Sequence, residues 1–187
     1  MLGRERDSIV RLAGMKSPTL IIFSGLPGSG KSTLASALAR HLSGVYLRID
    51  TIEQGLREIC KMDELGGEGY QLAYRIAQEN LRTGNTVIAD SVNPWPLTRN
   101  EWNDVAKEVG AAFVNIEVIC SNQEEHRKRV ETRGSTVPGL KLPTWQEVLD
   151  RDYRAWDEER IVVDTSGRRV EDSLEELLST LCRRYPR

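Results

Sequence analysis

The chain has 187 residues and a formal net charge of −2, and 39% of its residues are hydrophobic. These values exclude a disordered low-complexity chain, and they exclude a global positive field that would draw nucleic acid or an anionic membrane. The length favours a single domain over residues 1–187. Three widely spaced cysteines, a charged N-terminus and the lack of an apolar run of bilayer length favour a cytoplasmic protein with reduced thiols.

Short apolar segments alternate with helical patterns along the chain. Residues 1–16 precede the first strand as an N-terminal appendage without a readable role. Strands are expected over residues 19–24, 45–49, 86–89, 112–119 and 160–164. Helices are expected over residues 34–42, 51–61, 70–83 (with Leu72, Ile76 and Leu81 inward), 97–109 and 123–133, from Thr144, and from Asp172 or Ser173. Because this alternation requires β–α–β crossovers, we expect an α/β protein with a mostly parallel sheet covered on both faces.

The first strand is followed by a glycine-rich turn that fits the phosphate-loop pattern G-x-x-x-x-G-K-[ST]. Glycines let the backbone bend so that several N–H groups face a phosphate, and the helix that follows adds its positive N-terminal dipole. Lys31 would contact the β- and γ-phosphates, and the Ser32 hydroxyl would ligate Mg²⁺. The expected nucleotide-binding residues are Gly25, Gly28, Ser29, Gly30, Lys31, Ser32 and Thr33.

Aspartates end the second and third expected strands, at the edge where ligands bind in parallel α/β sheets. Asp90 matches a carboxylate that holds Mg²⁺ through water, although it could instead only cap the turn that follows. Asp50 is the candidate base that accepts the proton of an acceptor hydroxyl. The residues from Asp50 to Glu53 also fit a capping box, so Asp50 could be only a helix N-cap, or could have both roles.

Three further residues are candidates for an acceptor pocket that also contains Asp50. Arg57 lies two turns into the helix that follows Asp50, where it could reach an anionic substrate or simply be solvated. Trp95 and Arg99 follow Asp90, where a substrate pocket would form, although a lone tryptophan near prolines is as often a packing residue.

A charged helix leads into a loop at residues 134–143 that is bounded by glycine and proline. Arg129 and Arg133 lie one turn apart on one face of this helix, and Lys141 within the loop is a weaker candidate. This arrangement suits a lid, in which arginines cover the transferring phosphates while the loop closes and excludes water. The alternative is a solvated charged face on which neighbouring glutamates pair with these arginines. His126 on the same helix is isolated, and we expect it to have no ligand role.

With these motifs the chain resembles P-loop kinases of small molecules, a family that includes adenylate, shikimate, gluconate and adenylylsulfate kinases and the zeta toxins. It is most similar to the kinase-like branch labelled AAA-type. The resemblance covers about residues 18–166 and depends on the phosphate loop, Asp50, Asp90 and the two lid arginines. It implies a three-layer P-loop NTPase fold with a five-stranded parallel sheet of order 2-3-1-4-5 and a short lid. It also implies Mg·ATP as the donor, with Arg129 near the adenine and Arg133 toward the phosphates.

Together these inferences predict an ATP- and Mg²⁺-dependent kinase that transfers the γ-phosphoryl group to a hydroxyl of a small molecule. Catalysis would depend on Lys31, Asp50, Arg129 and Arg133. One rival is a kinase that acts on a nucleic-acid 5′ end or a tRNA-linked hydroxyl, and a second is a nucleotide-binding switch without an acceptor. We expect no extended nucleic-acid footprint and no membrane partner, and the chain could be a monomer or a homodimer.

Overall fold

A computed structural model describes residues 17–184, so the appendage expected at residues 1–16 lies outside the described residues. Five parallel strands form one sheet in the order β2-β3-β1-β4-β5, and this confirms the expected topology. The strands are β1 (Thr19–Ser24), β2 (Val45–Arg48), β3 (Val87–Asp90), β4 (Ala112–Ile119) and β5 (Ile161–Asp164). The helices are α2 (Lys31–Leu42), α3 (Ile49–Ile59), α4 (Glu68–Arg82), α5 (Pro96–Glu108), α6 (Gln123–Thr132), α7 (Trp145–Leu149) and α8 (Val170–Arg184).

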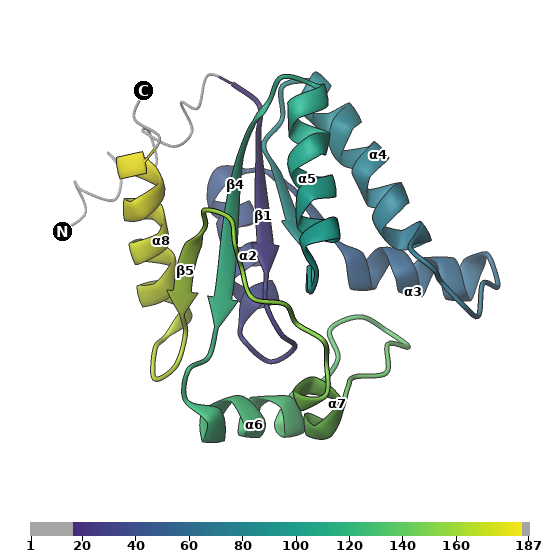
Figure 1. Ribbon diagram of the computed structural model, residues 1–187, viewed down its shortest axis with the longest axis vertical. Helices are drawn as coiled ribbons and strands as arrows, with labels where there is room; N and C mark the ends of the chain where they lie inside the picture. The colour runs from purple at the N-terminus through teal and green to yellow at the C-terminus, as the bar shows by residue number, and fades with distance from the viewer. Residues whose placement is uncertain (1–16, 185–187) are drawn as a thin grey trace.

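Helices cover both faces of the sheet, which gives three layers (Figure 1). The apolar faces of α2 and α8 pack on one face, and those of α4 and α5 pack on the other. Every residue of the central strand β1 is buried, as expected for a parallel strand that is covered on both sides. Within residues 17–184, no helix has the length and apolar character needed to cross a membrane.

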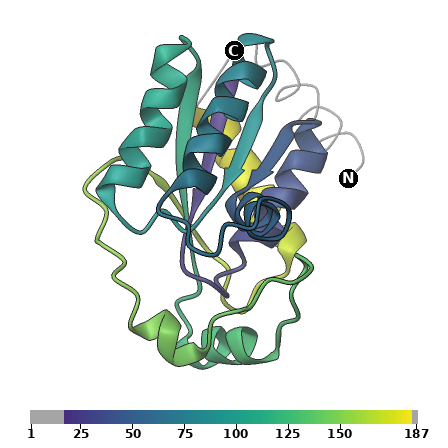
Figure 2. The same cartoon turned by 90° about the vertical axis from the view of Figure 1, so that its right-hand side faces the viewer.

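The carboxyl ends of the central strands meet at one edge of the sheet. The strand register pairs Asp90 with Phe23 of β1 on one side and with Arg48 of β2 on the other. The phosphate loop, Asp90 and the start of α3 are therefore neighbours. Figures 1 and 2 show α6 and α7 lying across the space beyond this edge.

The junction between β2 and α3 differs from the expectation. The strand ends at Arg48, and α3 begins at Ile49 without an intervening turn. Ile49 is buried in the core beside Leu47, so the helix begins as soon as the chain leaves the sheet. Arg48 is the N-cap and makes no side-chain capping hydrogen bond. Asp50 therefore lies inside the first turn, and the alternative that it is the N-cap is wrong.

Helix α4 presents a different stripe to the core from the one expected. Leu81 is buried as predicted, but Leu72 is 40% exposed, so its inward placement was wrong. The buried stripe runs through Ala73 and Ala77, whose small side chains let the helix backbone approach the sheet closely.

Candidate active site

The phosphate loop has the backbone geometry that close approach of a phosphate requires. Gly25, Gly28 and Gly30 have positive φ values of 142°, 86° and 90°. A Cβ atom on Gly28 would also overlap Cγ2 of Val130 on α6. Only glycine adopts this combination without strain, and α2 begins directly after it at Lys31.

Asp90 is the centre of a buried charge cluster beside the loop. Its Oδ1 accepts a hydrogen bond from Nζ of Lys31 at 2.9 Å, and its Oδ2 accepts one from the Tyr46 hydroxyl at 2.5 Å. Burial would raise the pKa of Asp90, but the Lys31 charge and hydrogen bonds from Tyr46, Lys31 and Ser32 outweigh it and lower this pKa. Burial and the Asp90 charge raise the pKa of Tyr46, so Tyr46 stays a proton donor to an ionised Asp90.

Ser32 and Asp90 provide oxygen atoms that suit a Mg²⁺ ion. Nζ of Lys31 lies 3.4 Å from Oγ of Ser32 and also binds Asp90, so the hydroxyl and the carboxylate share one neighbour. The described part of the chain contains no group of three or more His, Cys, Asp or Glu residues that could form a metal site by itself. Mg²⁺ fits this sparse donor set, because it keeps several waters and binds phosphate oxygens alongside one or two protein groups.

A nucleotide phosphate also fits the loop. Oγ of Ser29 is buried there without a hydrogen-bond partner among residues 17–184. A buried hydroxyl without a partner costs free energy, and a phosphate oxygen is the kind of acceptor that would relieve that cost.

Arg48 joins Asp50 to the expected lid loop. Its Nη2 and Nε donate to Oδ2 of Asp50 at 3.1 and 3.3 Å, and its Nη1 donates to Oγ1 of Thr136 at 2.7 Å. Nε of Arg48 also lies 3.8 Å from Oδ2 of Asp90. Oδ1 of Asp50 has no hydrogen-bond partner among residues 17–184. Sequence reasoning missed Arg48, although its place at a strand end, two residues before Asp50, was a usable signal.

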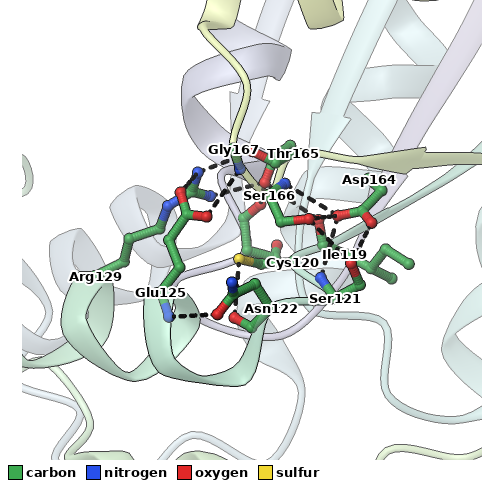
Figure 3. A network of polar contacts seen from close by, with 11 residues as sticks. Ile119, Cys120, Ser121, Asn122, Glu125, Arg129, Asp164, Thr165, Ser166 and Gly167 are labelled. Atoms are coloured by element: carbon green, nitrogen blue, oxygen red, sulfur yellow. Dashed lines mark hydrogen bonds and ion pairs between the residues drawn. The ribbon is translucent and has the colours of Figure 1, made fainter.

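Arg129 fastens α6 to the turn that follows β5 (Figure 3). Its Nη1 donates to Oγ1 of Thr165 at 2.7 Å, and its Nη2 donates to the Thr165 carbonyl oxygen at 2.9 Å and to Oε1 of Glu125 at 2.6 Å. Glu125 also accepts from the Gly167 amide at 2.8 Å, and the Thr165 hydroxyl donates to the Ser29 carbonyl oxygen at 2.7 Å. The glutamate pairing considered as an alternative for Arg129 is therefore present, and Thr165 links the network to the phosphate loop.

Arg133, one turn further along, is held differently. Its Nε is buried without a hydrogen-bond partner among the described residues. Desolvation lowers the pKa of Arg133, the Asp50 charge raises it and the Arg48 charge lowers it, so its guanidinium is close to both side chains. Arginine remains charged after such a shift. Arg133 is thus a cation beside Asp50 whose hydrogen-bonding capacity is not fully used.

One cavity of about 970 Å³ contains most of the predicted site. This volume is at the upper end of the range for small-molecule sites, so it has room for a nucleotide and a second small molecule. Its lining includes the predicted residues Gly28, Gly30, Lys31, Ser32, Thr33, Asp50, Arg57, Arg129 and Arg133.

Trp95 and Arg99 do not line this cavity. Arg99 is only 1% exposed, and its guanidinium lies 4.1 Å from the centre of the Trp156 ring. It ties the loop after β3 to the segment that returns from α7 by donating to the carbonyl oxygens of Asn93, Pro94, Arg154 and Ala155. Trp95 is exposed, and its indole nitrogen donates to Asp152 at 3.1 Å. Trp95 is the N-cap of α5 and Arg99 lies within this helix, and neither side chain lines the cavity.

His126 contacts the phosphate loop, which its isolation in the sequence did not indicate. Its Nε2 lies 2.9 Å from the Pro27 carbonyl oxygen, and its ring meets Trp145 of α7 edge to face at 5.2 Å. His126 therefore holds α6 and α7 against the loop.

A phosphate loop after β1, a buried aspartate at the end of β3 and a sheet of order 2-3-1-4-5 define a P-loop nucleotide-binding protein. Residues 20–151 match the protein family described as AAA domain, and the chain belongs to this family. The expected resemblance to P-loop kinases is confirmed by relatives and neighbours that carry kinase names.

Two curated relatives illustrate this similarity. The chain is 27% identical over 171 residues to a probable adenylyl-sulfate kinase of Aeropyrum pernix, which covers 86% of this chain and 90% of that protein. It is 29% identical over 154 residues to the L-seryl-tRNA(Sec) kinase of Methanococcus maripaludis, which covers 79% of this chain but only 59% of that protein.

Solved structures share the fold. The adenylylsulfate kinase of Mycobacterium tuberculosis, in complex with AMPPNP and APS, has a TM-score of 0.67 at 19% identity, covering 88% of this chain and 97% of that chain. A gluconokinase of Sinorhizobium meliloti has a TM-score of 0.61 at 19% identity, covering 90% of this chain and 94% of that chain.

Proposed function

We propose that the protein is an ATP-dependent kinase that transfers the γ-phosphoryl group to a hydroxyl of a small-molecule acceptor. The observation that carries this proposal is the shared cavity, which is lined by Lys31 and Ser32 of the phosphate loop and also by Asp50 of α3. Asp50 lines the same cavity as the loop, and its Oδ1 has no hydrogen-bond partner among residues 17–184, so this atom is available to an acceptor hydroxyl. The kinase names of the relatives support the same class.

In this proposal the chain binds the donor through the phosphate loop. The loop amides and Lys31 hold the phosphates, Ser32 and Asp90 hold Mg²⁺, and Arg129 lies toward the base. When bound, Mg·ATP supplies the phosphoryl group with part of its charge neutralised. The AMPPNP complex of the structurally similar adenylylsulfate kinase is consistent with ATP as the donor.

Asp50 is the proposed base. Its Oδ1 would accept the proton that the acceptor hydroxyl loses as the acceptor oxygen bonds to the γ-phosphorus and ADP leaves. Arg48 keeps Asp50 in one orientation through Oδ2, and Lys31 and Arg133 bring positive charge to the transferring group. The arrangement supplies position and charge, which phosphoryl transfer chiefly requires.

The test is transfer of labelled γ-phosphate from Mg·ATP into a pool of cell metabolites by wild type and by Asp50→Asn. We expect a labelled product with wild type and a fall in its rate of formation on the order of 10²- to 10⁴-fold in Asp50→Asn. Affinity for an ATP analogue should not change. If both proteins hydrolyse ATP at the same slow rate and label no product, the kinase proposal fails and a nucleotide-dependent switch remains.

A tRNA-linked hydroxyl is the second candidate acceptor, because one relative is named L-seryl-tRNA(Sec) kinase. The net charge of −2 favours a small acceptor over an extended nucleic-acid footprint. Titration with an oligoribonucleotide at two salt concentrations separates the candidates, since only a nucleic-acid kinase should show salt-dependent binding. Placement in the cytoplasm and a monomeric or homodimeric state stay predictions.

A further inference from the structure

The cavity is strongly positive. Its lining contains nine basic side chains but only two acidic ones, Asp50 and Glu53. This excess bears on what the cavity binds, because neighbouring like charges repel one another and an anion that enters the cavity offsets this repulsion. The basic residues are Lys31, Arg48, Arg57, Arg129, Arg133, Lys141, Arg151, Arg168 and Arg169.

These nine cations fall into two groups. Six of them have a carboxylate partner within the protein, as for Lys31 with Asp90 and Arg129 with Glu125. Across residues 17–184, the three without an ion pair are Arg133, Lys141 and Arg151. All three belong to residues 133–151, which we call the lid segment.

The lid segment lies against α3, on the proposed acceptor side of the cavity. Thr136 accepts the hydrogen bond from Arg48, and a Cβ atom on Gly139 would overlap the Glu58 carboxylate and approach Gln54. The backbone at Gly139 has a φ of 72°, so glycine lets the loop both turn and touch α3. Lys141 follows two residues later.

Lys141 and Arg151 flank α7 in the sequence, and both line the cavity. Hydrogen bonds from Thr144 lower the pKa of Glu147, and the charges of Lys141 and Arg151 add to this effect, so both are close to Glu147. Glu147 is occupied by its capping box with Thr144 and does not line the cavity. Within residues 17–184, Lys141 and Arg151 therefore form no ion pair, and Glu147 is an acidic neighbour that stays outside the cavity lining.

In the proposed function, the phosphates of ATP have partners other than Lys141 and Arg151. The loop amides and Lys31 serve its phosphates in the proposed function, and Arg133 beside Asp50 serves the transferring group. Lys141 and Arg151 come from later in the lid segment and line the same cavity.

We propose that the acceptor carries an anionic group, either a carboxylate, a phosphate or a sulfate, in addition to its hydroxyl, and that Lys141 and Arg151 hold this group. This inference depends on the proposed function. It makes Lys141 and Arg151 specificity residues, and it couples recognition of the acceptor to closure of the lid segment.

The test compares matched pairs of hydroxyl compounds with and without an anion: gluconate with glucose, and glycerol 3-phosphate with glycerol. The proteins are wild type, the double variant Lys141→Gln/Arg151→Gln, and Lys128→Gln as a control. Lys128 is an exposed residue of α6 outside the cavity lining, so it controls for the loss of one surface charge. Phosphate transfer from Mg·ATP is measured with each compound, and binding of each compound is measured with a non-hydrolysable ATP analogue present.

We expect wild type to prefer the anionic member of at least one pair by about tenfold or more, as befits a charge-assisted contact. The double variant should lose this preference through a raised KM, while its affinity for the ATP analogue and the behaviour of Lys128→Gln should match wild type. A carboxylate site would respond to gluconate, and a phosphate site to glycerol 3-phosphate. Equal use of charged and neutral members, or an unchanged preference in the double variant, overturns the inference.

The binding measurement keeps this inference separate from the proposed function. If no compound is phosphorylated, none of the four is the acceptor and the metabolite-pool experiment decides the kinase proposal, yet anion-selective binding that disappears in the double variant would still support the lid-segment site. Binding of an oligoribonucleotide alone, without either anionic probe, would contradict a small-molecule acceptor.

Discussion

The two sides of the cavity hold their charges in different ways. On the sheet side, Lys31, Asp90 and Tyr46 satisfy one another in a buried cluster that exists without any ligand. On the lid side, Arg133, Lys141 and Arg151 have no carboxylate partner within the described residues. The difference teaches that the protein itself balances the charges on the sheet side, whereas the lid side keeps three cations that form no ion pair among residues 17–184.

Loss of Lys31 should have the largest effect on stability. Lys31→Met leaves the fully buried Asp90 without its closer ion-pair partner, with only Arg48 at 3.8 Å remaining, and loss of one partner of a buried pair costs about 3–5 kcal/mol. Urea denaturation should show this loss in the free energy of unfolding. Lys128→Met, which removes an exposed lysine, should change that energy by no more than about 0.5 kcal/mol. Equal stability of the two variants would mean that the sheet side is not held together by its own charges.

Loss of the Tyr46 hydroxyl should have a smaller effect. Tyr46→Phe removes one hydrogen bond to a buried carboxylate, and such a bond contributes about 1.5–3 kcal/mol. Tyr153→Phe is a matched control, because its hydroxyl donates to Glu117 at a longer 3.2 Å and Glu117 also accepts from Arg160. The denaturation midpoint should fall further for Tyr46→Phe than for Tyr153→Phe. The reverse order would show that the hydrogen bond to Asp90 is not the more stabilising of the two.

The network in Figure 3 predicts a pH dependence on the sheet side. Burial raises the pKa of Asp164, but hydrogen bonds from Ser121 and Ser166 outweigh it and lower this pKa from 3.8 to about 2. A lowered pKa stabilises the fold above pH 3.8, and this contribution is lost as the pH falls toward 2.

Unfolding of wild type and Asp164→Asn should be compared across this range. At pH 7 the free energy of unfolding of Asp164→Asn should be lower than that of wild type by the full contribution of the ionised carboxylate. This difference should shrink between about pH 4 and pH 2. A deficit that stays constant with pH would show that the ionised carboxylate is not what stabilises this turn.

Neutralising the lid cations should have the smallest effect on stability. Lys141→Gln/Arg151→Gln removes two exposed charges without breaking an ion pair, so the free energy of unfolding should stay within about 0.5 kcal/mol of wild type. A loss as large as that of Lys31→Met would show that the protein itself needs these cations, and would erase the contrast between the two sides.

The same contrast explains how much could be predicted from sequence. The glycine pattern predicted the phosphate loop, and the alternation of apolar segments with helices predicted the layers, because both are local signals. The contacts of Arg48 and Tyr46 were missed, since they depend on the register that pairs Arg48 with Asp90, although the place of Arg48 at a strand end was a signal.

The residues of the proposed acceptor site show most clearly what the sequence could not predict. Arg99 follows Asp90 closely in the sequence, yet the start of α5 carries it into a buried site lined with carbonyl oxygens. Lys141 and Arg151 reach the cavity only because the lid segment folds back over α3. The loop pattern pointed to Lys141, but no local pattern pointed to Arg151, which lies beyond the predicted loop and lines the same cavity.

The measurement that tests the central claim most directly is the ratio of phosphorylated product to ADP. A metabolite pool is separated by anion exchange into neutral and anionic fractions, and each is incubated with labelled Mg·ATP and the wild-type protein. The account predicts one labelled product molecule per ADP in the anionic fraction, and little ADP or product in the neutral fraction. Release of labelled inorganic phosphate at the same rate in both fractions, with no labelled product, would contradict it.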